Sequence, residues 1–144
     1  MKFQTIGPDK LNQLRHARVF KNSDDLYRHM KGHAALLRPK FQNVLSELEN
    51  RIAGTDIARW TNPKGGYFIS VNAMEGTAKR TLQLCQEAGV VMTPAGATFP
   101  YGKDPRDSNI RVAPSLPPVS ELEAAMEVFC ICLRIAALEK LLAK

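Results

Sequence analysis

The stretch that decides the fold is Ile57-Ala58-Arg59-Trp60-Thr61-Asn62-Pro63-Lys64-Gly65-Gly66-Tyr67-Phe68-Ile69-Ser70-Val71. Its last five residues are mostly aromatic or β-branched, which is typical of a β-strand. Residues 57–60 form a shorter strand candidate. The Asn-Pro-Lys-Gly-Gly run between the two holds the residue types that tight turns require. The stretch therefore predicts a β-hairpin.

Helical patterns lie on both sides of this hairpin. Apolar residues recur at steps of three and four, as in amphipathic helices, over residues 11–20, 23–52, 76–88 and 120–142. In the second of these segments, Ser23 is placed to cap the start and Gly54 to end the helix. Pro39 should bend or split it, because proline has no backbone N–H to donate.

Two further strands are expected at residues 90–93 and 109–113, with a loop over residues 94–106 between them. This order of elements predicts an α/β or α+β sandwich, in which helices pack on one small mixed or antiparallel sheet. The helix over residues 23–52 would be ~40 Å long at 1.5 Å per residue. A helix of that length connects two domains or lies along a whole sheet.

Length and composition indicate a soluble globular chain. Its 144 residues are 44% hydrophobic and 24% charged, which excludes a disordered or low-complexity protein. No apolar run approaches the ~18–20 residues that span a bilayer, and no signal peptide is evident, so we expect a cytoplasmic protein without a membrane partner. The net charge of +6 is concentrated in residues 1–60, which carry 11 Lys/Arg against 6 Asp/Glu. These basic residues are spread out and form no dense block, which favours a solvated surface over binding of nucleic acid.

Two pairs of residues have spacings that could indicate a metal site. His29 and His33 are four residues apart, so both imidazoles can share one helix face, but no third ligand is evident. Cys130 and Cys132 are two residues apart in a helical segment, so their thiols point in opposite directions. We expect no metal site and buried, reduced thiols.

Arg111 is the residue whose position most strongly indicates binding. It stands in the middle of a short strand candidate, directly after the long loop. A guanidinium is costly to bury unless it meets an anion, and it can hold a carboxylate by two parallel hydrogen bonds. A structural salt bridge, or an edge strand with the side chain in water, would explain the same position.

Several segments together resemble the pyridoxal-phosphate-dependent aminotransferases of fold type I. Residues 60–68 resemble the hairpin of these enzymes, and residues 89–99 with 109–111 resemble the later part of their small domain. Residues 5–16 and 33–41 are similar, more narrowly, to a bacterial aspartate aminotransferase subgroup related to aminotransferase-like transcription regulators. The resemblance covers essentially the whole chain.

The resemblance implies a division of the chain. Residues 1–22 would be the tail of a large cofactor-binding domain, residues 23–52 a long interdomain helix, and residues 53–144 the C-terminal small domain. Arg111 matches the arginine that binds the substrate α-carboxylate in this family. The neighbouring Asn109 is a second candidate substrate-binding residue, and the loop residues Phe99 and Tyr101 would line the site.

The resemblance also implies what this chain lacks. The family's cofactor, pyridoxal phosphate, forms a Schiff base with a lysine of the large domain, and that lysine, the aspartate at the pyridinium nitrogen and the phosphate cup have no match here. We therefore expect no catalytic and no cofactor-binding residue in this chain, and no activity without the large domain. The implied substrates are an amino acid, with aspartate or glutamate expected from the subgroup, and a 2-oxo acid. Family members form homodimers.

Two alternatives come from other functional classes. The chain could be the effector-sensing part of a transcription regulator with an aminotransferase-like body, whose DNA-binding motif would lie upstream. It could also be a remnant domain that folds and catalyses nothing. A truncated segment of this kind should expose the apolar face of residues 11–52.

Overall fold

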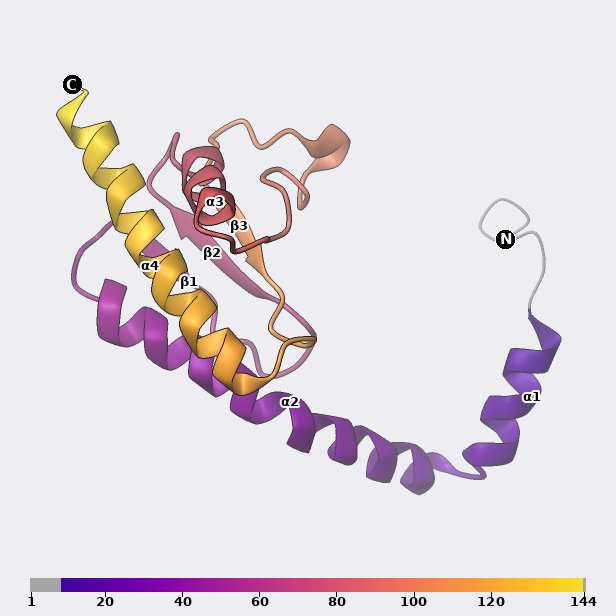
Figure 1. The fold of residues 1–144 in the computed structure, drawn as a ribbon. Helices are drawn as coiled ribbons and strands as arrows, with labels where there is room; N and C mark the ends of the chain where they lie inside the picture. Colours follow the sequence, from indigo (N-terminus) through magenta and orange to yellow (C-terminus); the bar gives the residue numbers. More distant parts are fainter. Residues whose placement is uncertain (1–8, 144) are drawn as a thin grey trace. The chain divides into compact units, whose positions relative to one another are not determined.

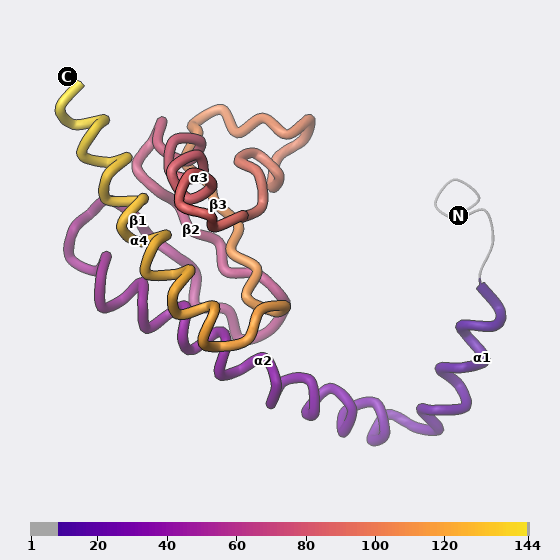
Figure 2. The backbone as a smooth tube through the Cα atoms, in the orientation of Figure 1, coloured from indigo at the N-terminus to yellow at the C-terminus, as the bar shows by residue number. Residues whose placement is uncertain are grey.

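The computed structural model describes residues 9–143, which divide into two compact units, residues 9–36 and 37–143. Figures 1 and 2 trace the order of the elements along the chain. They are α1 (Lys10–Val19), α2 (Ser23–Ile52), β1 (Ala58–Trp60), β2 (Ile69–Ala73), α3 (Ala78–Glu87), a 3₁₀ turn (Pro100–Gly102), β3 (Asn109–Val112) and α4 (Val119–Leu142).

The three strands form one antiparallel sheet in the order β1-β2-β3. The predicted hairpin is present, but its second strand begins two residues later than expected, because Tyr67 and Phe68 belong to the exposed connection. The expected strand at residues 90–93 is wrong. This segment has no regular secondary structure and pairs with no strand among the described residues, and Val91 is 86% exposed.

Helices cover one face of this sheet, so that the second unit has two layers (Figure 1). Inward-facing residues of β2 and β3 alternate with outward-facing ones and meet the buried stripes of α2, α3 and α4. The buried core comprises Val44, Leu48, Ile52, Ile69, Val71, Ala73, Ala78, Cys85, Ile110, Val112, Leu122, Met126, Phe129, Cys130, Cys132 and Leu133. The expected α+β architecture is therefore confirmed, with an antiparallel sheet.

Helix α2 differs from its sequence-based expectation at its start and in its middle. The side-chain oxygen of Asn22, not that of Ser23, accepts the backbone N–H of Asp25 at 2.9 Å and caps the helix. The helix continues unbroken through Pro39, where the surrounding turn is exposed and water can satisfy the freed carbonyl. Its end agrees with expectation, since Gly54 adopts a left-handed φ of 77° just after Ile52.

The first unit, described from residue 9, buries little of its apolar surface. Helix α1 has no buried residue, and the apolar side chains of Leu11, Leu14 and Met30 are exposed. Asp9 caps α1 by accepting the N–H of Asn12 at 3.0 Å. The turn expected at Gly7-Pro8 lies outside the described residues. No helix among the described residues is long and apolar enough to cross a membrane.

The three cysteines are free and buried, as expected. The Cys130 thiol donates to the carbonyl of Glu47 at 3.9 Å, whereas Cys132 lies beside Cys85 of α3, so the two thiols of α4 face different surroundings. Burial raises the pKa of Cys85 to about 12, with a further contribution from the neighbouring Cys132, and burial likewise raises the pKa of Cys130 to about 12.

These raised pKa values predict slow thiol labelling. Because the thiolate is the reactive species, both groups should stay protonated and unreactive at pH 8. Ellman's reagent should modify the folded chain slowly, and should modify all three thiols at once after unfolding in guanidinium chloride. Rapid labelling of Cys85 or Cys130 in the folded chain, located by peptide mapping, would contradict this packing.

Candidate functional site

The sheet face opposite the helices carries polar side chains in two rows. The antiparallel register places Arg59 of β1, Asn72 of β2 and Asn109 of β3 in one row. In the neighbouring row, Ser70 of β2 pairs directly with Arg111 of β3. Because side chains alternate between faces along a strand, this polar face follows from the same alternation that builds the core on the other side.

The Arg111 side chain lies on this face and forms no hydrogen bond with any of residues 9–143. Its guanidinium carbon lies 4.5 Å from the centre of the Phe68 ring, so the cation stacks on an aromatic face. Its Nε atom is buried and makes no hydrogen bond. No carboxylate among residues 9–143 pairs with Arg111, so the structural salt bridge left open by the sequence is not formed there. A buried N–H without an acceptor is expensive, and an incoming anion would satisfy it.

Asn109 uses both of its side-chain donors within the protein. Its Nδ2 donates to Ser70 Oγ at 2.9 Å and to Asn72 Oδ1 at 2.8 Å, and its Oδ1 accepts from Thr98 Oγ1 at 2.7 Å. An amide has only two N–H donors, so Asn109 has none left for a carboxylate. This arrangement ties the loop to the sheet beside Arg111.

The loop of residues 94–106 is anchored to the start of β3 by Asp104. Burial opposes ionisation of its carboxyl, but hydrogen bonds from the backbone N–H groups of Asn109, Ser108 and Arg106 outweigh it, so the pKa of Asp104 is lowered. Of the two expected lining residues in this loop, Phe99 is half-buried, whereas Tyr101 is 97% exposed.

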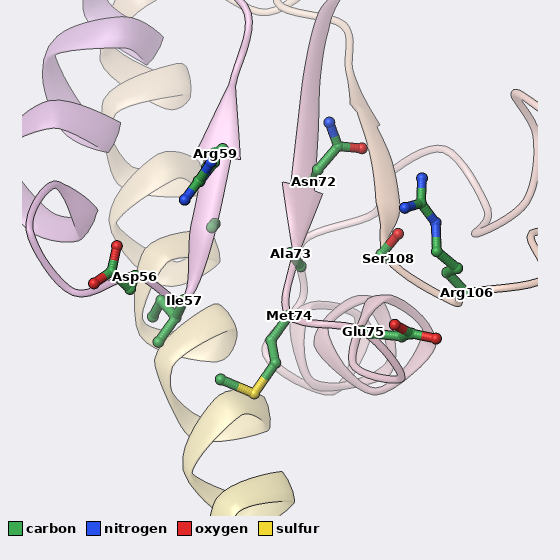
Figure 3. A pocket seen from close by; sticks show the side chains of 10 residues that line it. Asp56, Ile57, Arg59, Asn72, Ala73, Met74, Glu75, Arg106 and Ser108 are labelled. Carbon is green, nitrogen blue, oxygen red and sulfur yellow. The ribbon is translucent and has the colours of Figure 1, made fainter.

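A recess of about 320 Å³ opens at the end of the polar face away from Arg111. Figure 3 shows residues that precede β1 on one side and residues that precede β3 on the other, with the end of β2 between them. Its charged side chains are two arginines and two acids. Their formal charges cancel, so the recess favours neither a cation nor an anion. The lining residues are Asp56, Ile57, Ala58, Arg59, Asn72, Ala73, Met74, Glu75, Arg106 and Ser108.

His29 and His33 lie on one face of α2, as their spacing predicts, with their Nε2 atoms 3.0 Å apart. The two rings meet edge to face, and Phe20 packs against His29 at a centroid distance of 5.1 Å. Among the described residues, no group of three or more metal-ligating side chains of His, Cys, Asp or Glu comes together.

Sequence reasoning singled out Arg111 and Asn109 but missed three side chains around them. Phe68, Ser70 and Asn72 lie at alternate positions of one segment, which is a signal that they share a face. What the sequence did not contain was the register that sets Ser70 opposite Arg111.

Residues 37–143 thus form an α+β domain whose open sheet face carries the Arg111 guanidinium. The full chain, residues 1–144, matches the sequence model of the family described as aspartate amino-transferase, and the chain belongs to this family. The aspartate aminotransferase of Corynebacterium glutamicum is 49% identical over 134 residues, which are 93% of this chain and 31% of that protein.

Two crystal structures are similar in both sequence and fold. An aspartate transaminase from Corynebacterium glutamicum has a TM-score of 0.89 at 47% identity, covering 96% of this chain and 33% of that one. A Corynebacterium diphtheriae protein assigned as an aminotransferase has a TM-score of 0.88 at 52% identity, covering 96% and 34%. The chain thus spans about a third of the length of these relatives, and it corresponds to their C-terminal part.

Proposed function

We propose that this chain is the C-terminal segment of a pyridoxal-phosphate-dependent aminotransferase and that its Arg111 binds the α-carboxylate of the amino-acid substrate. The observation that carries the proposal is the buried Arg111 Nε without a partner, on a sheet face that the helices leave open. Membership of the aminotransferase family supports it.

The environment of Arg111 fits a carboxylate. The planar guanidinium presents parallel N–H donors that match the two oxygens of a carboxylate, and stacking on Phe68 limits rotation of the fork. Holding the carboxylate at a fixed point orients the rest of the amino acid, which is a positional contribution to catalysis.

The same face does not fit attachment of the cofactor. Its outward-facing strand residues, Arg59, Ser70, Asn72, Asn109 and Arg111, include no lysine and no carboxylate. The proposal therefore places the lysine, the aspartate and the phosphate cup in a preceding large domain. Pyridoxal phosphate, when bound there, supplies the electron sink of the reaction.

The wider assignment divides the chain as the family resemblance implies. In this proposal residues 1–22 end the large domain, residues 23–52 connect the domains, and residues 53–144 form the small domain. The exposed apolar side chains of Leu11, Leu14 and Met30 support it, because the missing domain would cover such a surface. The complete enzyme would act in the cytoplasm as a homodimer on aspartate or glutamate and a 2-oxo acid.

Separating the chain from the large domain tests this proposal. The 144-residue chain mixed with pyridoxal phosphate should show no visible absorbance band of lysine-bound cofactor and no amino transfer from L-aspartate to 2-oxoglutarate. The longer protein that carries this segment should show both. A stoichiometric band in the isolated chain would contradict the placement of the lysine, and a longer protein without amino transfer would contradict the proposed activity.

A further inference from the structure

We propose that the Ser70 hydroxyl donates a third hydrogen bond to the carboxylate that Arg111 holds, which makes Ser70 a substrate-binding residue. This inference rests on the proposed function of Arg111. It concerns the row of the open face in which these two side chains stand opposite each other.

The backbone hydrogen bonds show that the two residues form a closely spaced pair of the antiparallel sheet. Ser70 directs both its backbone N–H and its carbonyl away from β3 and toward Thr61, the residue after β1. The N–H donates to Thr61 Oγ1 at 3.1 Å, and the carbonyl accepts the Thr61 N–H at 3.0 Å. Ser70 and Arg111 therefore form the non-hydrogen-bonded type of antiparallel pair. In such pairs the Cα atoms are only ~4.5 Å apart and the side chains approach most closely.

The hydroxyl of Ser70 has a donor to spare. Its oxygen accepts the Asn109 Nδ2 at 2.9 Å, which fixes the oxygen, and its own proton has no acceptor among residues 9–143. A hydroxyl can accept and donate at the same time. The Ser70 hydroxyl and the Arg111 guanidinium therefore belong to directly paired residues, on the face where the carboxylate would bind.

Asn72 provides a matched comparison for Ser70. Both residues lie on β2, both face outward, and each accepts one hydrogen bond from the Asn109 Nδ2. Asn72 stands in the other row, opposite Asn109 and not opposite Arg111. Removing either side chain deprives Asn109 of one acceptor, but only removal of the Ser70 hydroxyl takes a donor from beside Arg111.

The test uses steady-state kinetics of the longer protein with L-aspartate and 2-oxoglutarate. Ser70→Ala should raise the KM for L-aspartate about tenfold, since a hydrogen bond to a charged group is lost, and should change kcat less than about twofold. Ser70→Thr retains the hydroxyl and should restore the KM to within about twofold. Asn72→Ala should change the KM by less than about threefold.

The outcomes separate this inference from the proposed function. Equal KM increases for Ser70→Ala and Asn72→Ala would overturn it, because both would then act through Asn109. An unchanged KM in Ser70→Ala, together with a large increase in Arg111→Ala, would overturn the role of Ser70 and leave that of Arg111 intact. An unchanged KM in Arg111→Ala would instead contradict the proposed function.

Discussion

Replacing Arg111 by alanine in the longer protein should raise the KM for L-aspartate about 100-fold. The substrate would lose two charge-assisted hydrogen bonds, worth about 1.5 kcal/mol each, and about 1.4 kcal/mol corresponds to a factor of ten. The stability of the fold should change little, because Arg111 makes no ion pair among the described residues and leaves one buried donor unsatisfied.

Two further variants show whether the charge or the planar geometry of Arg111 sets the KM for L-aspartate. Arg111→Lys keeps the positive charge but cannot form the planar two-point contact, so its KM should lie between those of the parent and the alanine variant. Arg59→Ala removes an arginine from the same sheet face, in the row that does not contain Arg111, and its KM should stay within about threefold of the parent. An unchanged KM in Arg111→Ala would refute the carboxylate-binding role.

Replacing Phe129 by alanine should reduce the free energy of unfolding of the chain by about 3–5 kcal/mol, the range for truncating a large buried aromatic side chain. Phe129 has no exposed surface and is the largest of the fully buried side chains. Its helix, α4, packs against α3 and contributes to the same core cluster as α2 and the sheet, so the lost ring would leave a cavity among several elements. Urea denaturation followed by circular dichroism measures the change.

Ile131 offers a matched control on the same helix. It is two residues from Phe129 and 48% exposed, so Ile131→Ala should cost less than about 1 kcal/mol. Phe129→Leu removes less volume and should fall between the two, which keeps the measurement possible if the alanine variant does not fold. Equal losses for Phe129→Ala and Ile131→Ala would contradict the described packing of α4.

Local patterns were sufficient for most elements but not for every strand. The three- and four-residue spacing of apolar residues predicted α2 with the bounds that the structure shows, since helix periodicity depends only on neighbours in the chain. The apolar run at residues 90–93 looked equally strand-like, yet a strand exists only where a partner supplies hydrogen bonds. Val91 faces solvent, and its segment pairs with no strand in the part of the chain that the structure describes.

The candidate site divides in the same way. Arg111 could be selected from the sequence, because a guanidinium in a short strand after a long loop is costly to bury unless it meets an anion. The hydrogen bonds of Asn109 to Ser70 and Asn72 could not be predicted from the sequence, and neither could the position of Phe68 over the guanidinium. Both depend on contacts between segments about forty residues apart.

The sequence by itself determined the helices, the hairpin, the family and the arginine, since each of these is encoded in residues close together along the chain. Only the tertiary structure decided that the Asn109 amide has no donor to spare, that Arg111 forms no ion pair with any of residues 9–143, and that Ser70 stands opposite it. The physical reason is strand register. A shift of one residue between β2 and β3 would turn every side chain to the other face, and long-range packing of the core is what excludes that shift.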